Sequence, residues 1–138
     1  TGMAILSDVG EENDIHPRNK KDVGERLALL ALKNDYGFDI VSSGPLYQSH
    51  QNFDKYIEVD FKSKGSGLSA KENLSGFEIA SENGIFHQAS AKITNDKVRV
   101  FSKNVNNPIQ VRYGWKNWFK GTLFNKEGLP ASSFNSSN

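Results

Sequence analysis

An aspartate and a histidine two positions apart, Asp14 and His16, are the side chains of this sequence best suited to acid–base chemistry. An imidazole titrates close to neutral pH, so His16 can take a proton from a hydroxyl nucleophile and return it to a leaving alkoxide. A carboxylate such as Asp14 can hold that ring in the correct tautomer. The same spacing before Pro17 is also typical of a polar helix entry. The pair therefore predicts half of a hydrolytic triad, which a nucleophile must complete.

No nucleophile motif accompanies the pair in the 138 residues. Neither Gly-x-Ser-x-Gly, which places a serine on an exposed strand-to-helix turn, nor Gly-Asp-Ser occurs. Ser42, Ser43, Ser66 and Ser69 lie in Gly/Ser-rich stretches that are typical of ordinary turns. We therefore expect the nucleophile to lie outside this chain.

Composition and charge exclude several classes of function. Seventeen Lys and Arg residues balance sixteen Asp and Glu, which leaves a formal charge of +1, and the basic residues are dispersed along the chain. This distribution argues against a nucleic-acid partner. No apolar run approaches the ~20 residues of a membrane span, so none is predicted. The chain has no Cys, and neither His50 nor His87 has a second ligand at metal spacing, so no metal site is expected.

The first 37 residues or so predict a strand, a loop and a helix. Met3–Ser7 is a short apolar run that suits the end of a buried strand. A helix is expected to start near Pro17 and to stop at Asn34–Gly37. Charged residues, Arg26 among them, should occupy its outward positions. Its inward stripe should consist of Val23, Leu27, Leu30 and Ala31.

From Ile40 onward, apolar and polar residues alternate, which predicts half-buried antiparallel strands. Asn83-Gly84 and Asn95-Asp96 lie between such runs, where two-residue hairpins need residues that adopt positive φ cheaply. We expect six or seven short strands in a β-sandwich that begins near Ser42–Pro45. The clearest strand candidates are 56–61, 89–94, 98–100 and 109–113.

An aromatic cluster near the end of the chain has two interpretations. Trp115, Trp118 and Phe119 stand beside Arg112 and Tyr113 and could form an apolar, cationic surface for a sugar. Large aromatic side chains more often dominate core or interface packing, so the cluster could instead join the β-rich part to the helical part.

The longer motifs around His16 resemble a known family. His16-Pro17-Arg18-Asn19, with Gly24 and Ala28, resembles the last conserved block of the SGNH, or GDSL-type, hydrolases, a block that carries the catalytic histidine. The whole chain is similar to the carboxyl-terminal part of the sialate O-acetylesterases in that superfamily. The strings that carry this similarity are Thr1–Ala4, Asp14–Lys20, Val23–Leu29, Ser43–Tyr47, Gly76–Ala80, Asn107-Pro108 with Val111–Tyr113 and Trp115, and Leu123–Ser132.

The resemblance implies a fold class and two domains. Residues 1–43 would be the C-terminal strand–loop–helix piece of an SGNH hydrolase domain, and residues 44–138 a C-terminal β-sandwich domain with a flexible tail from Ser132 to Asn138. The expected fold is thus an α+β fragment. It would comprise the terminal strand and helix of an SGNH α/β hydrolase sheet, followed by an antiparallel β-sandwich.

The resemblance also implies a chemistry. The chain would belong to an esterase that removes O-acetyl groups from sialic acid, or a related acetylated sugar, by serine acyl transfer, with no metal or organic cofactor. His16 would be the general acid/base and Asp14 would orient its ring. The superfamily usually places its acid three residues before the histidine, where Asn13 stands here. A backbone carbonyl, Asp8 or Glu12 therefore remain alternatives to Asp14.

The resemblance further implies what this chain must bind. The family's serine and oxyanion-hole donors have no matching positions here, so the partners would be the acetylated sugar and the remaining N-terminal part of the same enzyme. The chain alone would be incomplete and inactive, and the family suggests a periplasmic or secreted location. The alternative is a non-catalytic carbohydrate-binding or structural β-sandwich module. Exposed Trp115 and Trp118 would favour that module, and an open His16 would favour the hydrolase.

Overall fold

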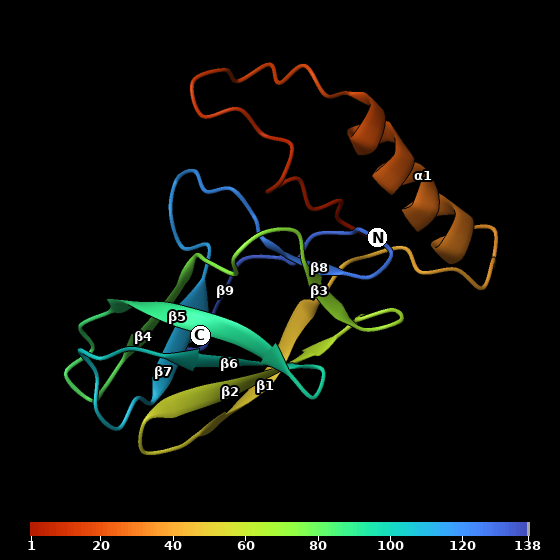
Figure 1. Cartoon of the computed structure of the whole chain (residues 1–138). Helices are drawn as coiled ribbons and strands as arrows, with labels where there is room; N and C mark the ends of the chain where they lie inside the picture. The colour runs from red at the N-terminus through yellow and green to blue at the C-terminus, as the bar shows by residue number, and fades with distance from the viewer. Residues whose placement is uncertain (138) are drawn as a thin grey trace.

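The structure is a computed structural model that describes residues 1–137. A loop-rich N-terminal part, with helix α1 (Lys21–Asn34), lies above a β-rich part (Figure 1). Within the described residues, no helix is long and apolar enough to cross a membrane.

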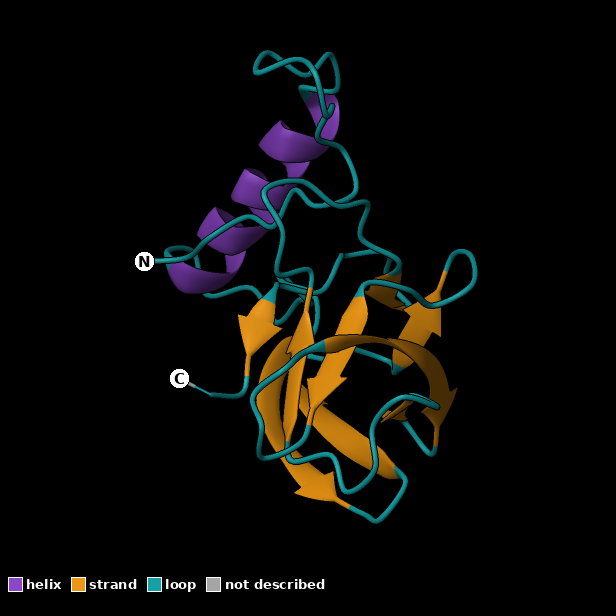
Figure 2. Cartoon of the chain, turned by 90° about the vertical axis from the view of Figure 1, so that its left-hand side faces the viewer, coloured by secondary structure: helices purple, strands orange, loops and turns teal. Residues whose placement is uncertain are grey.

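Seven of the described strands form one antiparallel sheet in the order β1-β2-β6-β5-β4-β7-β9, and β3 pairs with β8 in a separate sheet. The larger sheet curls into a nearly closed, barrel-like layer (Figure 2). The strand bounds are β1 Leu46–Asn52, β2 Tyr56–Lys62, β3 Leu68–Ala70, β4 Phe77–Ala80, β5 His87–Thr94, β6 Lys97–Phe101, β7 Gln110–Tyr113, β8 Leu123–Asn125 and β9 Phe134–Asn135.

Aromatic rings bring the two edges of the curled sheet together. Tyr47 of edge strand β1 stacks on Phe134 of edge strand β9, with ring centroids 4.6 Å apart. Phe61 of β2 meets the same Phe134 ring edge-on at 5.8 Å. Offset-stacked and edge-on pairs are the favoured aromatic geometries. Side-chain packing therefore joins β1 to β9.

The core lies inside the curl. Alternation along β2 buries Ile57, Val59 and Phe61, which is the period-two pattern expected from the sequence. Tyr113 of β7 is fully buried, and its hydroxyl oxygen accepts the backbone N–H groups of Thr122 and Leu123 at 3.0 and 3.1 Å. Burial raises the pKa of this tyrosine. The remaining core side chains include Phe77, Ile79, Val98, Val100, Val111 and Leu123.

Of the two predicted hairpin turns, one is confirmed. Asn95 and Asp96 have φ of 52° and 57° and join β5 to β6, as a two-residue turn with two positive φ angles requires. The Asn83-Gly84 prediction is wrong, because six residues separate β4 from β5. There the Asn83 side-chain oxygen accepts the Ile85 N–H, while Gly84 at φ 69° donates to the Ser81 carbonyl.

The expected fold class is wrong. Met3–Ser7 forms no strand, and no SGNH α/β sheet is present among residues 1–137. The Ser7 carbonyl instead accepts the Gly121 N–H at 2.9 Å, and the Ile5 carbonyl accepts the Arg26 guanidinium at 2.6 Å. A short apolar run does not distinguish a buried strand from a buried loop. The predicted β-sandwich is replaced by the single curled sheet with its small companion.

The helix bounds also differ from the prediction at one end. Helix α1 starts at Lys21 rather than near Pro17, and the Asn19 side-chain oxygen accepts the Asp22 N–H in its first turn. The predicted stop is confirmed, since Gly37 has φ 72° just beyond the last turn.

The C-terminal residues that the structure describes are paired rather than loosely ordered. Strand β9 pairs with β7, and Ser136 binds Val111 twice, through its N–H and its hydroxyl oxygen. A serine-rich composition gives no sign of such a cross-strand partner. Asn138, the last residue of the predicted tail, lies outside the described residues.

Candidate functional site

The loop that carries His16 is folded around its own carboxylates. The Asp14 Oδ1 atom accepts the His16 backbone N–H at 2.8 Å, and the Glu11 Oε1 atom accepts the Arg18 N–H, also at 2.8 Å. Glu11 and Asp14 also form an isolated β-bridge. The carboxylates thereby fix the main chain on both sides of Pro17.

The imidazole of His16 is exposed and makes no hydrogen bond or ion pair within residues 1–137. The structure thus joins Asp14 to His16, but through the backbone of His16 and not through its ring. A free ring can accept a proton and deliver it. The second Asp14 oxygen carries no hydrogen bond in the described part of the chain, so it is free to accept one.

A buried ion pair anchors this loop to the helix that follows it. The two oxygens of Asp8 face the two terminal nitrogens of Arg26, both at 2.7 Å, and each side chain is 9% exposed. The paired, bidentate geometry is the strong form of this contact. Asp8 is therefore held by Arg26, whereas Glu12 is exposed and remains the other acidic alternative near His16.

The outward position expected for Arg26 is wrong, because it is the most buried residue of the helix. The sequence did carry a signal, since Arg26 stands three residues after Val23 and four before Leu30, within the apolar stripe. An arginine at such a position needs a carboxylate partner. Asp8 supplies it.

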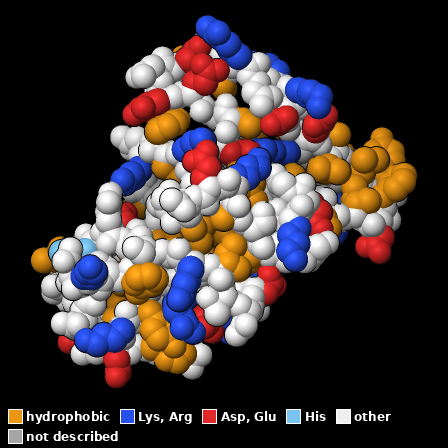
Figure 3. All heavy atoms as spheres, in the orientation of Figure 1, with side chains coloured by type: hydrophobic (Ala, Val, Ile, Leu, Met, Phe, Trp, Pro, Cys, Tyr) orange, Lys and Arg blue, Asp and Glu red, His pale blue; other side chains and the backbone are white. Residues whose placement is uncertain are grey.

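The apolar stripe of α1 is only partly covered. Leu27 is 53% exposed and Leu32 36%, and Ile15 beside His16 is 90% exposed. Figure 3 shows apolar side chains at the surface among the charged groups of this helical part. The expectation that Leu27 packs inward is therefore wrong within residues 1–137.

The aromatic cluster is divided between the core and the surface. Trp115 and Trp118 are 46% and 40% exposed. Phe119 is half-buried and meets the buried Tyr113 ring edge-on, at 5.3 Å between centroids. Of the two interpretations, packing holds for Phe119, whereas both tryptophans present apolar surface to solvent.

The other candidate side chains have structural roles. The Tyr47 hydroxyl lies 2.7 Å from Nδ1 of His50, whose Nε2 faces the Ile109 carbonyl at 3.3 Å. Burial raises the pKa of Tyr47. The Ser66 hydroxyl donates to the Glu127 carboxylate, as suits a turn residue. Across residues 1–137, no group of three or more metal-ligating side chains is close enough to hold an ion.

Comparison of the sequence with known protein families finds no match, and comparison with curated proteins finds none either. Among solved structures, the chain is similar to a carbohydrate acetylesterase from Xanthomonas citri. The two share 39% sequence identity over 96% of this chain, with a TM-score of 0.91. The chain spans 32% of the length of that structure. The similarity relates this chain to a carbohydrate esterase.

Proposed function

We propose that this chain is the His16-bearing portion of an esterase that removes O-acetyl groups from sialic acid or a related acetylated sugar. The observation that carries the proposal is the likeness to a carbohydrate acetylesterase along 96% of the chain. The exposed imidazole of His16, which makes no hydrogen bond within residues 1–137, supports it. The serine nucleophile would lie on the rest of a longer protein, called here the longer enzyme.

In this mechanism, His16 moves the proton in each of two steps. It takes the proton of the serine hydroxyl as that oxygen attacks the acetyl carbonyl, and it then protonates the departing sugar alkoxide. An acetyl-serine remains. His16 next takes a proton from water as the water attacks this ester, and it returns the proton to the serine oxygen as acetate leaves.

Asp14 would orient the imidazole for this work. Its Oδ1 atom is occupied by the His16 N–H, and its second oxygen would accept the ring N–H once the longer enzyme encloses the loop. Asp8 is less suited to the role, because Arg26 engages both of its oxygens. Fixing the backbone of His16 also limits where its ring can reach, which favours acid–base transfer.

The remaining N-terminal part of the enzyme would cover the apolar surface beside His16. Ile15, Leu27 and Leu32 expose apolar area that is unfavourable in water. Exposed apolar side chains on the loop and helix that carry His16 are the part of this surface available to an interacting domain. We infer that this surface packs against the domain that supplies the serine.

Hydrolysis of p-nitrophenyl acetate tests the proposal. The chain of residues 1–138 by itself should release no nitrophenolate above the buffer rate, because it lacks a nucleophile, while the longer enzyme should turn over. Rapid turnover by the chain alone would overturn the division of the triad between this chain and the rest of the enzyme. If the longer enzyme hydrolysed no acetylated sugar, the proposed esterase activity would be overturned.

A second function is favoured by one observation, the exposure of Trp115 and Trp118. Exposed tryptophans on one loop suit a non-catalytic carbohydrate-binding module, because their faces stack on the C–H groups of sugars. The two functions differ in what His16→Ala does. That change leaves sugar binding intact in a binding module and abolishes turnover in an esterase.

A further inference from the structure

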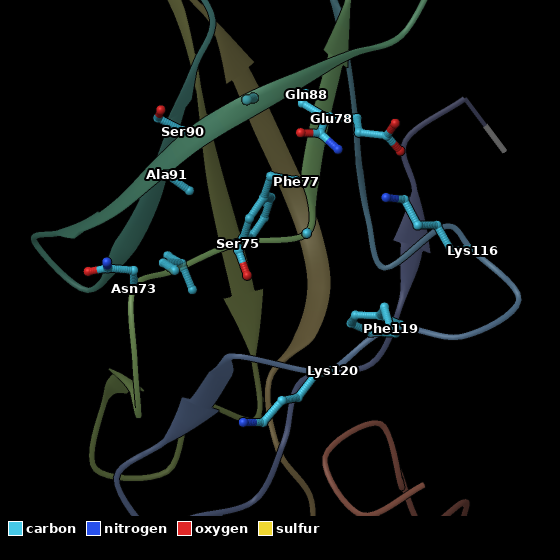
Figure 4. A pocket seen from close by; sticks show the side chains of 13 residues that line it. Asn73, Ser75, Phe77, Glu78, Gln88, Ser90, Ala91, Lys116, Phe119 and Lys120 are labelled. Carbon is cyan, nitrogen blue, oxygen red and sulfur yellow. The ribbon is translucent and has the colours of Figure 1, made fainter. Parts of the chain in front are cut away.

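A hollow of about 590 Å³ lies where strands β4 and β5 diverge. Residues Phe77–Ile79 of β4 pair with His87–Ala89 of β5, whereas Ser90–Thr94 of β5 pair with β6. The two segments therefore separate before Phe77 and after Ala89. The loop that follows β7, residues 114–120, forms the facing wall (Figure 4).

The floor of the hollow is apolar and rigid. Leu74, Phe77 and Ala91 line it, and Phe77 belongs to the core. The Phe119 ring completes it, held by its edge-on contact with Tyr113. Gly114 has φ 59°, and a Cβ on this residue would overlap the Phe119 ring. The wall is thus fixed before any ligand arrives, which reduces the entropy lost on binding.

The rim of the hollow carries polar groups that converge from three segments. Gln88 and Ser90 come from β5, Asn73 from the segment before β4, and Lys116 from the 114–120 loop. All four are exposed, and none of their side chains makes a hydrogen bond or ion pair within residues 1–137. Figure 4 shows the Lys116 and Phe119 side chains pointing from the loop into the hollow.

The charged side chains that line the hollow are held in ion pairs, except for Lys116. Glu78 pairs with Arg112 at 2.9 Å, and Lys120 pairs with Glu72 at 2.9 Å. Lys116 has no carboxylate partner in the described chain. A single uncompensated ammonium beside amide and hydroxyl groups suits a ligand with one carboxylate and several hydroxyls. A polyphosphate would need more cations than the hollow offers.

We propose that this hollow is a subsite for a carboxylate-bearing sugar residue of an oligosaccharide. The apolar floor would take the C–H face of the sugar ring, Gln88 and Asn73 would bind its hydroxyls, and Lys116 would bind its carboxylate. The subsite is separate from His16. It lies next to the N-terminal segment that leads to His16. Gly121, which directly follows the 114–120 loop, donates its backbone N–H to the Ser7 carbonyl.

The identification of the occupant as a sugar rests on the proposed function. A separate subsite for this sugar implies that the substrate is an oligosaccharide rather than a lone acetylated sugar. Trp115 and Trp118, the two tryptophans of the chain, lie on the 114–120 loop and serve as optical reporters. Their fluorescence and isothermal calorimetry would be followed as the chain is titrated with sialyllactose, with trigalacturonate, and with neutral maltotriose. Binding needs no turnover, so these titrations stand apart from any failure of the esterase assay.

We expect at least one acidic probe to bind saturably, and the two acidic probes then distinguish a sialic acid from a uronic acid. Lys116→Ala should weaken that binding about tenfold, the size of one charge-assisted hydrogen bond. Lys62→Ala, an exposed lysine outside the hollow, should leave it unchanged. Absence of calorimetric binding by either acidic probe at millimolar concentration would overturn the subsite. Binding of maltotriose as tight as that of the acidic probes would also overturn it. So would equal effects of Lys116→Ala and Lys62→Ala on binding.

Discussion

The Asp14 carboxylate accepts the backbone N–H of His16 at 2.8 Å, while the imidazole itself is left without a hydrogen bond in residues 1–137. Asp14 therefore fixes the main chain of His16. The orienting role that we propose for its second oxygen would be a separate function of the same side chain, and substitution can separate the two.

Asp14→Asn separates the two functions, because the amide oxygen still accepts the His16 N–H but cannot stabilise an imidazolium. We expect the urea midpoint of the chain to stay unchanged, and kcat of the longer enzyme to fall about 10²-fold or more. Steady-state kinetics on an acetylated sugar measures this. Wild-type turnover by Asp14→Asn would assign the orienting role to another group, such as Glu12.

Arg26→Met tests the buried ion pair that anchors the loop. Removing the guanidinium leaves the buried Asp8 carboxylate with only the exposed Lys71 ammonium, 4.0 Å away, which should lower the free energy of unfolding by about 3–5 kcal/mol. The double variant Asp8→Leu/Arg26→Met should lose less than Arg26→Met alone, because neither charge remains. Urea unfolding measures both. An Arg26→Met loss no larger than that of the exposed Lys21→Met would contradict the anchoring role.

Acid should weaken the fold through Asp96. A hydrogen bond from the Leu68 N–H at 2.7 Å, together with the nearby Lys64, lowers the pKa of Asp96 from its ordinary value. A carboxylate with a lowered folded pKa stabilises the fold above its unfolded pKa, about 3.9, and this contribution is lost as pH falls through the folded value. Asp96→Asn keeps a hydrogen-bond acceptor and does not titrate.

The melting temperature of the wild type should therefore exceed that of Asp96→Asn at neutral pH, and the difference should shrink as the pH falls below about 4. Asparagine also tolerates the positive φ of this turn, so backbone strain does not confound the comparison. A difference in melting temperature between the two proteins that stays constant from pH 7 to pH 2 would contradict the role of Asp96.

Leu27→Ala tests whether the rest of the enzyme covers helix α1. In the chain alone the side chain is 53% exposed, so the free energy of unfolding should change by at most about 0.5 kcal/mol. In the longer enzyme the same change should cost about 2–5 kcal/mol, because it would empty a packed site. Ile85→Ala, at a 58% exposed loop position, is the matched control and should be neutral in both. Equal small losses for Leu27→Ala in both proteins would contradict a covering domain.

Local patterns in the sequence predicted β2, β5, β6 and β7, but neither the other described strands nor the sheet they form. Alternation located β2, β5 and β6, and Asn95-Asp96 gave the turn between the last two. The closure of the sheet depends on Tyr47 meeting Phe134, a contact between residues far apart in sequence that no local period encodes. The same limit applies to Met3–Ser7, whose backbone carbonyls bond Gly121 and Arg26 instead of a neighbouring strand.

The candidate site was predictable in its residue types and not in its contacts. Asp14 and His16 are close because two positions separate them, but spacing does not tell whether a carboxylate meets the ring or the backbone N–H. The hollow between β4 and β5 had no sequence signal, because Gln88 and Lys116 come together only after the strands diverge.

The central claim is that His16 is the general acid/base of a carbohydrate esterase. The most direct measurement is kcat/KM of the longer enzyme on an acetylated sugar, for His16→Ala and for the matched control His87→Ala. His16→Ala should lose about 10⁴-fold or more in kcat/KM, while His87→Ala, a change on β5 away from the loop, should stay near wild type. Near-wild-type kcat/KM for His16→Ala, with the fold intact, would contradict it.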